Sequence, residues 1–407
     1  MKIHQFLKQQ KFFKLFIAAD LVSGFGSGIS FIGLNWHIIE STGKSANVGI
    51  YMAFGLFCGF IASPFSGTIV DRFNRRMVLI WLNLIQCLII LAVANILPLM
   101  TNQFPVLLFV GAVNSICFTI FIPAIGGFLK EIVRKKDLIY CNSIVEVALQ
   151  IAIFMAAGIT GWLYKIMGIR NILILDAATF LLAAILLLRI PLKSTRVKMV
   201  AESSWDQLCK GIRFLNVNKT ILVFALAIQI PYVVILASNV VLPVYVKRVV
   251  QADVVVFGLA EMCYGMGALA AGLLIHKLAE MWAFRPLVVL LFLVSIFSLV
   301  SLYFPAHQYG LYVIYMIFGV GNSSLKVVLN TRLMEIVPGS HFGRTVALSM
   351  GVSSLLQIGA AFGIGKLMDL VSPVYGFQIL AVLLVVSLIA ILPTLSHDTA
   401  KAEVRSG

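Results

Sequence analysis

The sequence predicts an all-α polytopic membrane protein with twelve transmembrane helices arranged in two halves of six. Of its 407 residues, 61% are hydrophobic and only 12% are charged, whereas soluble globular proteins carry about 25% charged residues. The mean hydropathy is +1.02. Apolar stretches of about 18 residues or more recur along the whole chain, and each is long enough to cross the hydrocarbon core of a bilayer.

Short charged connectors separate these stretches and define twelve expected spans. Their approximate limits are 14–38, 47–70, 77–98, 105–129, 139–164, 171–191, 220–246, 254–277, 286–305, 309–334, 343–368 and 374–394. The longest polar stretch divides them six and six, so we expect two six-helix halves at 1–191 and 220–407 with a cytoplasmic connector at 192–219. Inside that connector, apolar residues have the spacing of an amphipathic helix on the membrane surface: Trp205, Leu208, Ile212 and Leu215.

Charge placement predicts the topology. The net charge of +15 could suggest nucleic acid, but the basic residues fall in short connectors and not on a soluble module, which excludes that partner. With both termini cytoplasmic, 25 of the 31 Lys and Arg residues face the cytoplasm. The outer connectors hold only Lys44, Lys165, Arg170, Lys247, Arg248 and Lys366. We therefore expect a multi-pass protein of a bacterial-type cytoplasmic (inner) membrane with both termini inside.

The motifs of soluble enzymes are missing from the sequence. It has no phosphate-binding Gly-x4-Gly-Lys-Ser/Thr loop, no HExxH, no GxSxG and no paired Cys/His metal spacing. The six cysteines are scattered, and none is in CxxC spacing. We expect no enzyme, no cofactor and no metal site. The partner that the composition indicates is the lipid bilayer.

The two halves contain an internal repeat. Three short matches carry it: residues 67–72 with 272–277, Gly-x-x-Asn-Ser at 111–115 and 319–323, and Leu-Gln-Ile at 149–151 and 356–358. Their offsets of 205, 208 and 207 residues nearly agree. Parallel six-helix repeats with a binding site near the membrane midplane are one known plan of secondary transporters.

The stretch Gly67-Thr-Ile-Val-Asp71-Arg72-Phe-Asn-Arg75-Arg76 closely resembles the loop motif of the major facilitator superfamily. Segments 129–143, 175–180 and 335–344 are similar to its macrolide-efflux and siderophore-exporter branch. The resemblance covers almost the whole chain and implies the twelve-helix major facilitator fold. It also implies a conformational latch, in which the glycine lets the second helix approach the eleventh and the arginines pair with acids ending the fourth. The implied latch residues are Gly67, Asp71, Arg72, Arg75, Arg76, Glu131 and Asp137.

Ionisable side chains inside spans are costly and mark functional candidates. The expected substrate and proton residues are Asp20, Glu146 with Gln150, Glu261, Lys326, Asn114, Asn322, Gln229, Tyr232, Asn239 and Gln357. Each also has a structural interpretation. In it, Asp20 binds a neighbouring helix end, Glu146 pairs with connector lysines and arginines, and the Lys326 ammonium extends to the cytoplasmic surface. Glu261 is then a solvated carboxylate at the outer rim, and the amides form helix–helix hydrogen bonds. Asp176 is interpreted as structural, and His37 as an interfacial residue.

The resemblance, together with Asp20 and Glu146, implies secondary export of a small amphipathic compound, a macrolide-like drug or a siderophore, by proton antiport with alternating access. The expected partners are therefore a small-molecule substrate and protons as coupling ion, with the chain acting as a monomer. Two features leave proton coupling open: the fourth span carries no charge, and Ser27 stands where the branch often has an acid. The alternatives are a metal-ion (iron-type) exporter of the same fold and a non-transporting sensor on a transporter scaffold.

Overall fold

The computed structural model describes residues 11–134, 137–191, 219–304, 307–337 and 339–403. Among these residues, eleven helices are long and apolar enough to cross a membrane. The described part of the chain is helical and contains no strand. The predicted amphipathic helix of the 192–219 connector lies outside the described residues, except for its last residue, Lys219.

The chain divides into two compact units. Unit 1 comprises residues 1–199 and 253–262, and unit 2 comprises 200–252 and 263–407. Unit 1 contains α2 (Lys11–Thr42), α3 (Ser45–Arg72), α4 (Arg75–Ile96), the 3-10 turn η1 (Leu97–Leu99), α5 (Phe104–Ile132), α6 (Leu138–Leu188) and the start of α10 (Val254–Met281). Unit 2 contains α8 (Lys219–Ala227), α9 (Ile230–Tyr245), the π turn η3 (Val246–Val250), the rest of α10, α11 (Phe284–Ser301), α12 (Gln308–Ile336), α13 (Gly339–Leu370) and α14 (Val374–Glu403).

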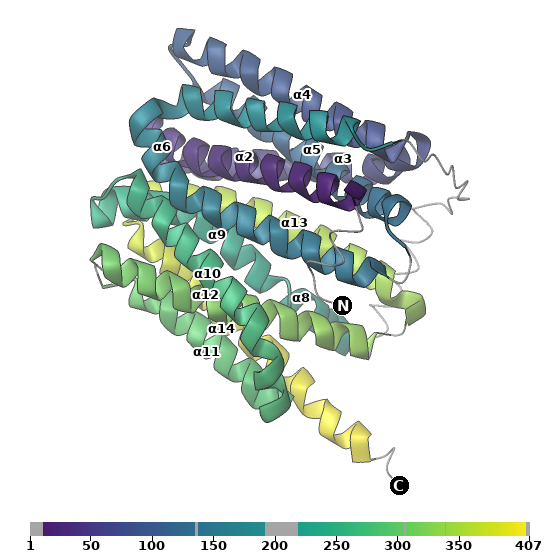
Figure 1. The fold of residues 1–407 in the computed structure, drawn as a ribbon. Coiled ribbons are helices and arrows are strands. Elements are labelled where there is room, and N and C mark those ends of the chain that lie inside the picture. Colours follow the sequence, from purple (N-terminus) through teal and green to yellow (C-terminus); the bar gives the residue numbers. More distant parts are fainter. Residues whose placement is uncertain (1–10, 135–136, 192–218, 305–306, 338, 404–407) are drawn as a thin grey trace. The chain divides into compact units, whose positions relative to one another are not determined.

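Helices pack side by side within each unit (Figure 1). In unit 1, α2 packs along α6, α3 along α5, and α4 against both α5 and α6. In unit 2, α11 packs on α12 and α14, while α9 packs on α13 and α14. Large apolar side chains nevertheless remain outside these contacts: Leu273 is 80% exposed, Phe297 74% and Leu88 66%. Surfaces of this kind are suited to lipid and not to water.

One break explains why eleven helices correspond to twelve predicted spans. α6 runs from 138 to 188 and covers the predicted spans 139–164 and 171–191. Gly168 interrupts it with φ 69° and ψ 175°. A positive φ is strained for residues with a Cβ, so glycine allows the chain to turn between two spans without a loop.

A second break lies at Pro231, the second residue of α9. The predicted span 220–246 is divided into α8 and α9, and Gln229 caps the second of these helices. Proline has no backbone N–H, so it is tolerated at the first turn of a helix and disfavoured further inside.

Candidate functional site

Asp20 and Glu146 lie on neighbouring helices of unit 1. α2 packs along α6, and a Cβ on Gly24, one turn after Asp20, would lie only 3.1 Å from Leu149 Cδ1. Asp20 is 5% exposed and interacts electrostatically with the exposed Glu146. Glu146 accepts a 3.2 Å hydrogen bond from Gln150 Nε2. Unit 1 therefore brings three of the predicted residues into one acidic cluster.

Glu261 lies on the part of α10 that belongs to unit 1. The helix backbones approach closely here: a Cβ on Gly161 would lie 2.4 Å from Val255 Cα, and a Cβ on Gly258 would lie 2.4 Å from the Ala157 carbonyl oxygen. Glu261 is half-buried within a turn of that contact. It makes no hydrogen bond or ion pair with any described residue, so its role as a substrate or proton residue stays a prediction.

The polar residues of α12 in unit 2 follow a four-residue spacing: Asn322, Lys326 and Asn330. Lys326 Nζ lies 5.3 Å from the centre of the Tyr232 ring on α9, within the range of a cation–π contact. Asn330 Nδ2 donates to the Tyr232 hydroxyl at 2.5 Å. Asn322 is fully buried and donates to the Tyr264 hydroxyl at 3.1 Å. Asn330 was absent from the predicted residues, although its spacing from Lys326 could have indicated it.

The remaining predicted amides belong to α5, α9 and α13. Asn114 on α5 accepts a 3.4 Å hydrogen bond from Gln86 on α4, which is a helix–helix contact. Gln357 donates to Ser353 one turn earlier on α13. Gln229 is 7% exposed at the start of α9, and Asn239 is half-buried further along that helix.

Asp176 is fully buried among residues of unit 1. Its Oδ2 accepts a 2.5 Å hydrogen bond from Ser30 on α2. A Cβ on Gly26 would lie 1.9 Å from Thr179 Oγ1 and 2.7 Å from Asp176 Oδ1, so only glycine fits there. These contacts join α2 to α6 and are consistent with the structural interpretation of Asp176.

The two arginines that begin α4, Arg75 and Arg76, have different partners. Arg75 Nη1 lies 2.9 Å from Glu131 Oε1, so the first residue of α4 pairs with the end of α5. Arg76 differs from the expectation of an acidic partner: its Nε and Nη2 donate to the Leu187 and Leu188 carbonyls at 2.9 and 2.6 Å. Those carbonyls lie at the end of α6, where the usual helical partners are missing; the Leu187 carbonyl also accepts from the Ile190 N–H at 3.2 Å, and the guanidinium adds a charged donor to each carbonyl.

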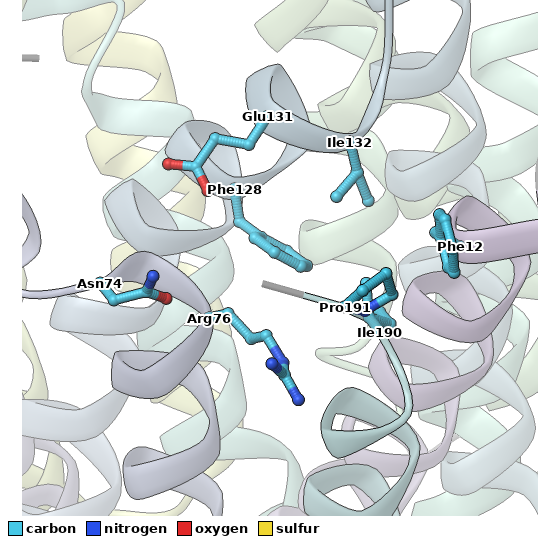
Figure 2. A pocket seen from close by; sticks show the side chains of 8 residues that line it. All are labelled: Phe12, Asn74, Arg76, Phe128, Glu131, Ile132, Ile190 and Pro191. Carbon is cyan, nitrogen blue, oxygen red and sulfur yellow. The ribbon is translucent and has the colours of Figure 1, made fainter. Parts of the chain in front are cut away.

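A cavity of about 50 Å³ lies beside these arginines. Figure 2 shows Arg76, Asn74 and Glu131 lining it together with apolar side chains of α2, of α5 and of the segment that follows α6. Gly67, Asp71 and Arg72 are exposed, and a Cβ on Gly67 would meet nothing within 4 Å. Asp137 is the N-cap residue of α6, without a side-chain capping bond.

A hydrogen-bonded chain occupies the opposite end of unit 1, where α2 ends. His37 Nε2 lies 2.8 Å from Gln103 Oε1, and His37 Nδ1 lies 2.9 Å from the Tyr164 hydroxyl. Tyr164 in turn donates to Glu40. The structure thus gives His37 specific partners on α6 and ahead of α5, beyond the interfacial position that was expected.

Next to Tyr164, Lys165 forms an ion pair with Asp253, which precedes α10. Partial burial alone would raise the pKa of Asp253, but hydrogen bonds from Lys165 and from the Val255 and Val256 N–H groups lower it below its ordinary value. The pair fixes the start of α10 within unit 1.

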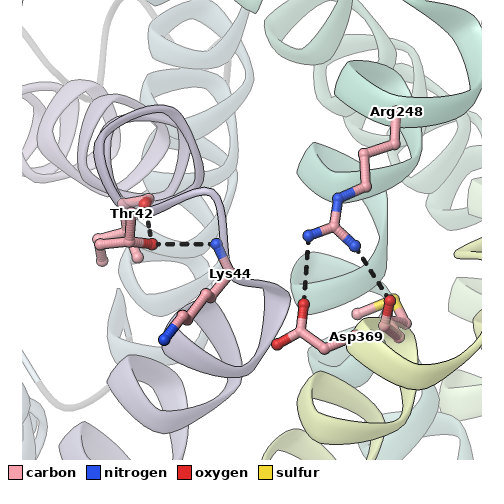
Figure 3. A network of polar contacts seen from close by, with 6 residues as sticks. Thr42, Lys44, Arg248 and Asp369 are labelled. Carbon is pink, nitrogen blue, oxygen red and sulfur yellow. Dashed lines mark hydrogen bonds and ion pairs between the residues drawn. The ribbon is translucent and has the colours of Figure 1, made fainter.

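Unit 2 has its own ion pair where α13 ends. Arg248 donates to the Asp369 carboxylate at 3.2 Å and to the Met368 carbonyl at 3.1 Å (Figure 3). Separately, in unit 1, the Lys44 backbone N–H donates to Thr42 Oγ1 at 3.4 Å, closing the turn between α2 and α3.

The family model described as Major Facilitator Superfamily matches residues 16–249 and 232–406. The chain belongs to this superfamily. It is therefore a multi-pass membrane transporter and not an enzyme.

The chain is also similar to individual proteins of known sequence or structure. The chain is 21% identical over 353 residues to "Macrolide efflux protein A" of Streptococcus pyogenes, covering 85% of this chain and 86% of the relative. Two solved structures share the fold. The nucleoside transporter NupG, in a mutant form, has a TM-score of 0.78 at 13% identity, covering 94% of this chain and 99% of its own. A bacterial homologue of the iron transporter ferroportin in the inward-facing state has a TM-score of 0.77 at 15% identity, covering 95% and 99%.

Proposed function

We propose that the chain is a secondary exporter of a small amphipathic compound, a macrolide-like drug or a siderophore, driven by proton antiport with alternating access. The likeness to a macrolide efflux protein over most of both chains supports the direction and class of transport. We infer that it works as a monomer in a bacterial cytoplasmic membrane, with both termini in the cytoplasm.

Asp20 carries the proton part of this proposal. It is a nearly buried carboxyl group within a span, and it makes no ion pair with a basic residue of the described chain. A carboxylate in hydrocarbon surroundings without a cation is costly, so binding and release of a proton would change its energy strongly. The nearby charge of Glu146 adds to that cost.

The test uses purified protein in proteoliposomes with an imposed pH gradient. We expect flux of erythromycin or a siderophore to follow the gradient, to collapse when it is dissipated, and to lose its pH dependence in Asp20→Asn. Glu280→Gln is the control, because it removes an acidic charge from an exposed residue of α10. Flux that is unaffected both by dissipation and by Asp20→Asn would exclude proton coupling through this residue.

The alternatives give different outcomes in the same vesicles. Metal-ion flux would favour the iron-type exporter. The likeness to the ferroportin homologue is a likeness of fold and does not by itself support metal transport. No flux of any candidate solute would favour the sensor.

We also propose that the 67–76 motif acts as the conformational latch that the superfamily resemblance implies. The ion pair between Arg75 and Glu131 within unit 1 supports this proposal.

A further inference from the structure

We propose that unit 2 contains an anion subsite formed by Lys326 and Tyr232, with Asn330 as a positioning residue. It rests on the proposed transport function and narrows its cargo: of the classes proposed above, it favours an amphipathic compound that bears a carboxylate or another acidic oxygen group over a basic macrolide.

The first step is the unpaired cation. Lys326 is half-buried on α12, inside a membrane span. None of the ion pairs formed by the described residues includes it. A cation inside a span is retained at a cost and pairs with an anion or carbonyl where one is present. Here the side chain lies over the Tyr232 ring, a contact that orients the ammonium group but leaves its charge uncompensated.

The second step is the direction of the Tyr232 hydroxyl. A phenol can donate one hydrogen and accept others. Because Asn330 Nδ2 donates to this hydroxyl, the oxygen is used as an acceptor and its own hydrogen remains to be donated. The cluster therefore offers an ammonium and a phenol as donors, and an acidic oxygen group is the ligand that satisfies both.

The third step is the selectivity of these donors. A protonated amine, such as that of a basic macrolide, would face the Lys326 charge at this cluster and be repelled. An anionic group would be attracted and would gain a charge-assisted hydrogen bond, which changes affinity by about 10-fold or more. Unit 2 thus favours an acidic amphipathic cargo over a purely cationic one.

The test compares dansylglycine, an amphipathic carboxylate, with its neutral methyl ester. Affinities are measured by fluorescence titration of the full chain in nanodiscs. We expect the wild type to bind the acid at least about 10-fold more tightly than the ester. Lys326→Met should abolish that preference while leaving ester affinity unchanged, and Lys326→Arg should keep it. Lys277→Met, which removes an exposed lysine of α10, is the matched control and should behave as the wild type.

Tyr232→Phe keeps the ring beneath the ammonium and removes the hydroxyl, so it should lose part of the preference. Asn330→Ala should lose a similar part, and adding it to Tyr232→Phe should cost nothing more, because Asn330 acts through that hydroxyl. A merely structural role of Asn330 would instead lower affinity for acid and ester equally.

Three results would overturn the subsite: a wild type that binds the acid no more tightly than the ester, a Lys326→Met variant that keeps the preference, or one that loses both ligands equally. The proposed export function fails separately, through absent flux in proteoliposomes. Acid-selective binding without flux would therefore support the subsite and refute the exporter, and flux without acid selectivity would do the reverse.

Discussion

The close contact between α6 and the start of α10 makes a quantitative prediction for two neighbouring glycines. A Cβ on Gly161 would lie 2.4 Å from Val255 Cα, whereas ordinary van der Waals contact begins at 3.4 Å. Backbone must therefore move by about 1 Å, a form of overpacking that costs about 1–3 kcal/mol. A Cβ on Gly158 would lie equally close, at 2.4 Å, to Met262 Sδ. That flexible side chain can rotate away at about 0.5–1.5 kcal/mol.

The two alanine variants are thus matched. Both gain about 1 kcal/mol of helix propensity, which cancels in their comparison. We expect Gly161→Ala to be less stable than Gly158→Ala by about 1–2 kcal/mol, seen as a lower melting temperature by about 2–4 °C per kcal/mol in detergent micelles. If Gly161→Ala melts at the same temperature as Gly158→Ala, or higher, the reasoning that this contact is fixed by backbone is wrong.

Three further outcomes are expected. Asp71→Ala should slow transport in proteoliposomes while sparing substrate affinity, and unchanged transport would refute the latch. Ser30→Ala should lower stability by about 1–3 kcal/mol in thermal melts, because the fully buried Asp176 loses its donor; an unchanged melt would contradict that role. Asp253→Asn should cost at most about 1 kcal/mol, since its pair with Lys165 is half-exposed. The lowered pKa of Asp253 means that this contribution is present at neutral pH and disappears as the pH falls below about 4, so the wild type and Asp253→Asn should converge in acid.

Hydropathy and charge were sufficient to predict the helices, because a bilayer imposes a minimum apolar length and a charged boundary on every span. The turn between the fifth and sixth spans was less predictable. Lys165 and Arg170 bracket it as they would bracket a loop, yet the structure keeps helix on both sides of Gly168. Prolines are equally ambiguous: Pro231 coincides with a break, whereas Pro64 and Pro123 lie inside α3 and α5.

The ionisable residues within spans could be identified from the sequence, but their contacts could not. Asp20 and Lys326 could be identified because polar residues are rare within spans, where a charged side chain has a high free-energy cost. The contacts of polar residues within spans often join distant parts of the chain. Ser30 and Asp176, for example, are 146 residues apart. No periodic pattern encodes such a contact. The exception is Asn330, whose position one helical turn after Lys326 places it on the same face.

The single-residue turn at Gly168 has a mechanical consequence. Two helices meet at Gly168, whose backbone is non-helical, within the range Leu138–Leu188, so almost no loop separates the two spans. We expect a tilt of the first span to move the second, because no flexible loop lies between them. The second span meets Arg76 through its last carbonyls. We therefore expect a tilt of these joined spans to reach the contact between Arg76 and the end of α6.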